Sequence, residues 1–111
     1  MPTVRQITRL PEQDIKQLLK HARRIHKSPE LDILIAPARL PYGRILVITP
    51  ARIGNAPQRN LLRRRLKAVF YEEKLFSLGF DCAIIAKLKA TTLDFDALKT
   101  LLMKTLTSFK P

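Results

Sequence analysis

Five basic side chains within nine residues have the types and the spacing needed to hold a run of phosphate groups. In RNLLRRRLK, Arg59, Arg63 and Lys67 recur at every fourth residue, and Asn60 and Arg64 stand beside them. A helix turns by about 100° per residue, so this spacing places the three cations on one helical face. Four of the five cations are arginines, whose planar guanidinium groups bind phosphate oxygens through two parallel hydrogen bonds. The pattern indicates a surface that binds a nucleic-acid backbone.

The alternative interpretation of this segment is a solvated helix face without a partner. Like charges four residues apart destabilise a helix by about 0.2–0.5 kcal/mol per pair, and no acid is interleaved before Glu72. A face selected only for solubility would mix both signs. The whole chain shows the same excess, with 21 Lys and Arg against 9 Asp and Glu and a formal net charge of +12. Such an excess favours a polyanionic partner, nucleic acid before an anionic membrane surface.

The sequence offers little for catalysis by protein side chains. A nuclease needs clustered carboxylates to hold metal ions, or paired histidines for proton transfer. Asp94 and Asp96 fit the start of a helix, and the spacing of His21 and His26 suits surface residues. The single cysteine, Cys82, lies in an apolar run and is predicted to be a buried thiol. We therefore assign no catalytic residue and no metal ligand to the protein.

Hydrophobic spacing predicts a helix near each end of the chain. The first helix opens at Pro11 and has Arg23 and Arg24 near its end. Its apolar stripe comprises Ile15, Leu18, Leu19, Ala22 and Ile25. The last helix has Asp94 as its N-cap. Its apolar face comprises Phe95, Leu98, Leu102, Thr105 and Phe109.

Three strands are predicted between these helices. Residues Leu31–Pro37 alternate in polarity, and Arg44–Thr49 is so apolar that it predicts an interior strand covered on both faces. Phe80–Lys87 is a third buried strand, and a further short strand between Arg24 and Glu30 is an open alternative. With the basic helix included, the order is helix, strand, strand, helix, strand, helix. This order predicts a single α+β sandwich domain over residues 1–111.

Capping signals set the limits of the basic helix. Asn55 is the expected N-cap, with Gln58 completing a variant capping box, and Gly79 is expected to stop a helix that runs to about Leu75 or Leu78. The apolar face of this helix should meet the sheet through Leu62, Leu66, Val69, Phe70 and Phe76. Arg65 falls on neither the apolar nor the basic face.

The stretch RIGNAPQRNLLRRRLK, followed by the strand FDCAIIAK and a closing helix, resembles the protein subunit of bacterial ribonuclease P. That family carries a strand, a basic loop with glycine, and a helix that opens on Arg-Asn-Arg. The first helix and the strand in SPELDILIAP also fit, so the resemblance extends over nearly the whole chain. Leu61 and Ala51 stand at positions where the family usually has basic residues.

The resemblance implies an α-β-β-β-α-β-α sandwich like the ribosomal protein S5 domain 2-like fold. It also implies the protein component of an endoribonuclease that removes the 5′ leader from precursor tRNA. In that family the catalyst is an RNA subunit with Mg²⁺ held mainly by RNA. The implied partners are this catalytic RNA and the 5′ leader.

Two sets of site residues follow from the resemblance. Contacts to the catalytic RNA are expected from Arg52, Arg59, Asn60, Arg63, Arg64 and Lys67. A cleft for the leader, between the first helix and the sheet, is expected to have a floor of Ile15, Leu19, Ile33 and Leu34, for which ordinary core packing is the alternative.

Three other functions remain open at this point. A ribosomal or RNA-chaperone-like binding module would share the basic helix without any role in cleavage, and a small self-sufficient nuclease would cleave RNA alone. A membrane-surface role fits worst, because the apolar face of the basic helix is needed in the core. No apolar run is long enough to span a bilayer, and the N-terminus lacks the hydrophobic core of an export signal, so a cytoplasmic location is expected. No obligate protein partner is evident.

Overall fold

The computed structural model describes residues 1–109, and in this part of the chain the centre is a four-stranded sheet. Its strands are β1 (Arg23–Lys27), β2 (Leu31–Pro37), β3 (Ile45–Ile48) and β4 (Phe80–Ala86), arranged in the order β1-β2-β4-β3. Strand β2 pairs antiparallel with both β1 and β4, whereas β3 runs parallel to β4.

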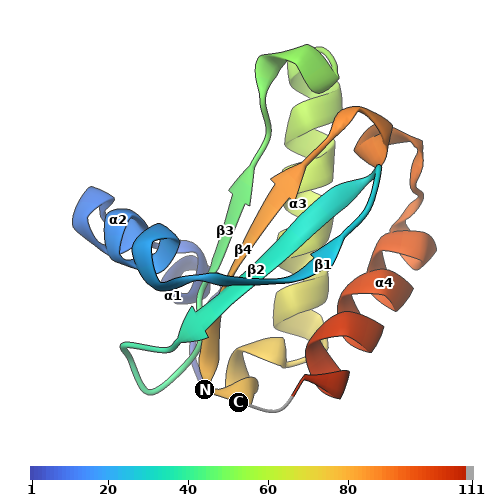
Figure 1. Cartoon of the computed structure of the whole chain (residues 1–111). Helices are drawn as coiled ribbons and strands as arrows, with labels where there is room; N and C mark the ends of the chain where they lie inside the picture. The colour runs from blue at the N-terminus through green and yellow to red at the C-terminus, as the bar shows by residue number, and fades with distance from the viewer. Residues whose placement is uncertain (110–111) are drawn as a thin grey trace.

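Helices cover both faces of this sheet unequally. The long helices α3 (Ala56–Glu72) and α4 (Phe95–Ser108) pack on one face; in Figure 1, α3 lies behind the strands and α4 to their right. Helix α2 (Glu12–His21), at the left of Figure 1, packs on the other face near one end of the sheet. A short helix, α1 (Val4–Thr8), contacts α3 and β3. Residues 1–109 also contain three 3₁₀ turns: η1 (Ala51–Ile53), η2 (Leu75–Leu78) and η3 (Leu88–Thr92).

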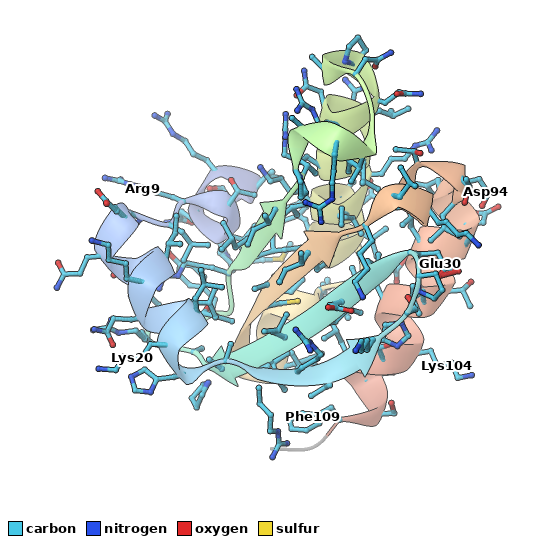
Figure 2. The ribbon with its side chains drawn as sticks, turned by 45° about the horizontal axis from the view of Figure 1, so that its top comes forward. Arg9, Lys20, Glu30, Asp94, Lys104 and Phe109 are labelled. Atoms are coloured by element: carbon cyan, nitrogen blue, oxygen red, sulfur yellow. The ribbon has the colours of Figure 1, made fainter. Side chains whose placement is uncertain are left out.

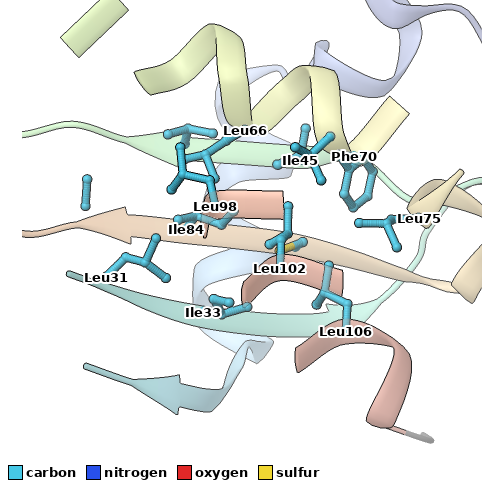
Figure 3. Packing of buried hydrophobic residues seen from close by; sticks show 14 of the residues in the cluster. Leu31, Ile33, Ile45, Leu66, Phe70, Leu75, Ile84, Leu98, Leu102 and Leu106 are labelled. Atoms are coloured by element: carbon cyan, nitrogen blue, oxygen red, sulfur yellow. The ribbon is translucent and has the colours of Figure 1, made fainter. Parts of the chain in front are cut away.

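The main hydrophobic core lies between the sheet and the pair α3 and α4 (Figure 3). Alternate strand residues such as Ile33 and Ile84 point into it and meet Leu66, Phe70 and Leu102 of the two helices, all at most 1% exposed. A smaller cluster lies on the opposite face of the sheet. It comprises Leu18 of α2, Ala36 and Ala83, with Ala22, Leu34 and Leu46 packed around them. A residue's position in its strand therefore decides which of the two layers it joins.

The structure confirms the strand at Leu31–Pro37 and the cap of the last helix, where Asp94 Oδ1 accepts a hydrogen bond from the Ala97 N–H at 2.8 Å. The first helix ends at His21, so the prediction that its stripe includes Ile25 is wrong. Ile25 belongs instead to β1, the short strand left open above, because pairing with β2 provides Arg23–Lys27 with a backbone ladder.

The predicted interior position of the strand after Arg44 is also wrong, because β3 lies at an edge of the sheet. Its apolar composition has another cause. Ile45 and Val47 are buried in the main core, while Leu46 packs against the α2 cluster. Helices thus contact both faces of this edge strand, and α1 contacts it as well.

Helix α1 was not foreseen, although its N-cap has a recognisable signal. Thr3 Oγ1 accepts from the Gln6 N–H, and Gln6 Oε1 accepts from the Thr3 N–H, which completes a capping box. Ile7, with 0% exposure, anchors the helix in the main core.

Helix α3 ends at Glu72, a few residues before the expected Leu75 or Leu78. Lys74 adopts a left-handed conformation with φ 53°, and η2 then turns Leu75 and Phe76 into the core. Gly79 does mark a boundary, but it is the one between η2 and β4, where its φ of 89° suits glycine.

A buried ionic cluster ties α2 to the sheet. Arg44, only 3% exposed, donates from Nη1 to Asp14 Oδ2 at 2.7 Å, and its Nη2 lies 3.6 Å from Asp81 Oδ2. The backbone N–H of Arg44 also donates to Asp81 Oδ1 at 2.8 Å. Burial raises the pKa of Asp81, and the Arg44 hydrogen bonds and charge offset part of this effect. The hydrogen bond from Arg44 holds the pKa of Asp14 below its usual range.

Candidate nucleic-acid interface

The basic helix begins where its capping residues predict. Asn55 Oδ1 accepts from the Gln58 N–H, and Gln58 Oε1 accepts from the Asn55 N–H, both at 2.9 Å. This reciprocal box starts α3 at Ala56 and places Arg59 in its first turn.

We expect Asn55→Ala to lower the free energy of unfolding by about 1 kcal/mol, because the Gln58 N–H then loses its acceptor. Urea denaturation measures this change. Asn60→Ala is the matched control, since Asn60 is an exposed asparagine of the same helix that does not cap it. Equal losses in the two variants would contradict a capping role for Asn55.

The two faces predicted for α3 are present. Leu62, Leu66, Val69 and Phe70 are buried, whereas the side chains that project from the first turns of the helix reach into solvent and many end in nitrogen (Figure 2). Four of the predicted RNA-contacting residues line one pocket beside α1: Asn60, Arg63, Arg64 and Lys67. We call these four and Arg59 the basic face.

The remaining two predicted contacts lie N-terminal to this pocket. Arg59 is half-buried and lies one turn before Arg63 on α3, and Arg52 is exposed in η1. Neither residue lines the pocket shared by the other four. Arg52 and Arg59 therefore extend the cationic surface toward the loop that precedes the helix.

Arg63 is fixed by two hydrogen bonds. Its guanidinium group donates to Thr49 Oγ1, directly after β3, and to Asn60 Oδ1 on the preceding turn. Asn60 thus orients a neighbouring cation in addition to offering its own amide. Because the guanidinium group is already held in place, less side-chain entropy is lost when it binds a phosphate.

Arg65 points away from the basic face, as predicted. It lines a separate small pocket of about 50 Å³ together with Leu61 and residues of η3. Leu61 therefore lies beside Arg65 and not among the residues of the basic face. The basic face remains continuous without a cation at this position.

The cations of α3 have no acidic partners within the described chain. The salt bridges in residues 1–109 involve Lys16, Arg24, Arg44, Lys87 and Lys99, and none includes a residue of α3. A run of cations without counter-charges raises the local positive potential and favours a polyanion there.

The four residues predicted for the leader cleft do not lie together in the structure. Ile33 is 0% exposed and points into the main core, on the face of the sheet away from α2, so its assignment to the cleft is wrong. Neighbouring strand residues point to opposite faces, and Leu34 accordingly packs toward α2. On α2, Ile15 is half-buried and Leu19 is 42% exposed. The structure thus separates the four residues that the sequence had grouped.

A different strip of the same sheet face is left open by α2. The pairing register aligns Lys27, Asp32, Ile85 and Ile48 in one row across β1, β2, β4 and β3. Ile48 and Ile85 are half-buried, and the row ends next to Thr49, the partner of Arg63. We call this row the open strip. No local sequence signal identifies it, because it exists only once the strand order is known.

Two cations are held over the open strip by a buried acid. Asp32 lies 2.8 Å from Lys87 Nζ and 3.4 Å from Arg24 Nε. Burial tends to raise the pKa of Asp32, but the hydrogen bond from Lys87 and the nearby positive charges outweigh it, so the pKa is lowered. Asp32 therefore stays ionised near neutral pH and fixes the positions of Lys87 and Arg24.

Within residues 1–109, no three His, Cys, Asp or Glu side chains are grouped so that they could hold a metal ion. The buried carboxylates of Asp32 and Asp81 are already engaged by cations. Cys82 is fully buried, and this burial, followed by the charge of Asp81, strongly raises the pKa of its thiol. In the same residues, every helix is too short or too polar to cross a membrane.

Comparison with known proteins matches both the sequence and the fold. Residues 5–110 match the family described as Ribonuclease P. The "Ribonuclease P protein component" of Petrotoga mobilis is 30% identical over 77 residues, which cover 65% of each chain. That of Citrifermentans bemidjiense is 30% identical over 99 residues, 89% of this chain and 83% of the relative. The structure of the Staphylococcus aureus RNase P protein superposes with a TM-score of 0.78 over 92% of this chain and 94% of that one, at 17% identity.

Proposed function

This chain belongs to the ribonuclease P protein family, and we propose that it is the protein subunit of a ribonucleoprotein that removes the 5′ leader from precursor tRNA. The observation that supports this most directly is the basic face, which gathers Asn60, Arg63, Arg64 and Lys67 beside α1 without any acidic partner on α3.

The basic face binds the backbone of the catalytic RNA. Arg63, held by Thr49, and Lys67, one turn later, contact phosphates, and Arg59 and Arg52 continue the contact toward η1. Phosphate contacts of this kind fix the position of the protein on the RNA and supply affinity more than sequence preference.

The leader lies along the open strip. Ile48 and Ile85 offer an apolar floor for bases, and Lys87 and Arg24, oriented by Asp32, face the phosphates. The strip begins beside Thr49, whose hydroxyl accepts from Arg63 of the basic face, so one protein contacts both RNAs. It thereby lowers the repulsion between two polyanions.

The chemical step belongs to the RNA subunit. Bound Mg²⁺ supplies a nucleophile and neutralises charge at the scissile phosphate, and its ligands come from RNA in this proposal. The carboxylates buried in the protein are engaged by Arg44, Arg24 and Lys87 and do not fit as metal ligands. The side chains of the protein bind and orient the catalytic RNA and the leader, and their positive charges shield the phosphates of the two RNAs from each other.

The test is cleavage of a precursor tRNA at low Mg²⁺ by a bacterial ribonuclease P RNA alone, by the protein alone, and by both together. We expect the protein alone to be inactive and the mixture to cleave far faster than the RNA alone. Cleavage by the protein alone would overturn the assignment of catalysis to RNA. Binding without acceleration would instead favour an RNA-binding module with no role in cleavage.

A further inference from the structure

Helices α1 and α3 form a pocket of about 410 Å³ at the basic face. Three apolar or aromatic residues line one part of it: Val4 of α1 with Ala68 and Tyr71 of α3. The volume lies within the range of small-molecule sites, about 300–1,000 Å³. A surface that binds only the phosphate backbone does not need apolar and aromatic side chains in such a pocket.

The walls of this pocket are held in place by packing on both sides. Val4 is 47% exposed, yet α1 is fixed by its capping box and by the buried Ile7. On the opposite wall, the ring of Tyr71 is backed by Phe76, with 5.9 Å between ring centroids. The exposed Val4 and the packed ring of Tyr71 are therefore held in fixed positions on this surface.

The charges around the pocket are asymmetric. Arg63, Arg64 and Lys67 lie along it, and Glu72 lies at the C-terminal end of α3. A phosphate is attracted by the three cations and repelled by the carboxylate. A ligand with an anionic part and a flat apolar part is thus oriented with its anion toward Arg63 and Lys67.

We propose that this pocket takes one unstacked nucleobase of the bound RNA, with the adjacent phosphates on Arg63 and Lys67. The inference rests on the proposed binding of RNA by the basic face and adds a specific contact to it. A bare phosphate makes no use of Val4 and Tyr71, and an apolar peptide makes no use of three cations. A nucleotide matches both parts, since bases stack on aromatic side chains while their phosphates bind cations.

The direct test uses the wild-type protein and two short RNA probes. Methyl NMR spectra of Val4 and Ala68 are recorded during titration with single-stranded r(A)₆ and with an abasic hexamer that has the same ribose-phosphate backbone. We expect ring-current shifts of both methyl groups with r(A)₆ only, while signals of Lys67 shift with both probes. Shifts at Lys67 without any at Val4 and Ala68 would overturn the pocket inference and leave the RNA-binding proposal intact. If Lys67 responds to neither probe, RNA binding by the basic face itself fails, and the inference fails with it.

A variant that fills the pocket gives a second test. Ala68→Leu is expected to weaken binding of a bacterial ribonuclease P RNA about tenfold, the loss of roughly one stacked base. The dependence of affinity on salt should not change, because no cation is removed. Ala97→Leu on α4 is the matched control, a half-buried helical alanine that does not line the pocket. Equal affinities of the two variants, with both folded by circular dichroism, would contradict the proposal.

Discussion

Replacing Arg63 and Lys67 together by alanine is expected to weaken binding of a bacterial ribonuclease P RNA by about 10- to 30-fold at physiological salt. Each phosphate neutralised by the protein releases counterions and contributes about 0.7–0.9 to the slope of log affinity against log salt. The loss of two contacts should therefore reduce that slope by about 1.4–1.8. Filter binding or fluorescence anisotropy over a series of salt concentrations measures both quantities.

The matched control removes the same charge elsewhere. Lys20→Ala/Lys104→Ala removes two exposed lysines, Lys20 of α2 and Lys104 of α4. These two lysines lie on opposite sides of the molecule in Figure 2. Both double variants lower the net charge equally, but only Arg63→Ala/Lys67→Ala alters the basic face. Equal losses of affinity would show that overall charge, rather than the basic face, binds the RNA. Thermal unfolding should change little in either variant, since neither pair belongs to the buried core.

The features that sequence predicted well are those determined by local spacing. The basic face follows from helical periodicity, and the Asn55–Gln58 box follows from residues three apart. The same count separated Arg65 from the basic face, which its place in a different pocket confirms. Local rules suffice here because α3 is long, capped and amphipathic.

The features that sequence missed depend on pairing between distant segments. Ile33 and Leu34 are both apolar, and only the sheet shows that Ile33 joins the core while Leu34 faces α2. The apolar run at β3 predicted an interior strand because composition does not distinguish burial between strands from burial under helices. The open strip brings together residues of all four strands, including Ile48 and Ile85, so no single segment contains it.

Arg44 is a further case in which distant segments decide the outcome. The sequence predicted a nearly apolar strand from Arg44, whereas the Arg44 side chain joins a buried ionic cluster with Asp14 and Asp81.

We expect Arg44→Ala to lower the free energy of unfolding by about 3–5 kcal/mol, because Asp81 is left as a buried charge without its partner. Denaturant titration at pH 7 measures this loss. Arg44→Met/Asp81→Asn is the informative comparison, because it removes both charges and keeps an acceptor for the backbone N–H of residue 44.

The pH dependence of the Arg44→Ala variant follows from the two carboxylates. Without the guanidinium group, the pKa of Asp81, already raised by burial, rises further, so the folded variant binds a proton more readily than the unfolded chain. Its stability then falls as the pH rises from the unfolded pKa of Asp toward the folded one. Asp14 acts in the same direction but at lower pH, because the stability that its lowered pKa gives the wild-type protein is lost only as the pH falls from the unfolded pKa of Asp toward the folded one. The stability gap between wild type and Arg44→Ala should therefore narrow on acidification from pH 7 toward pH 4. A gap that stays constant over this range, or a double variant less stable than Arg44→Ala, would show that Arg44 acts by packing rather than by charge.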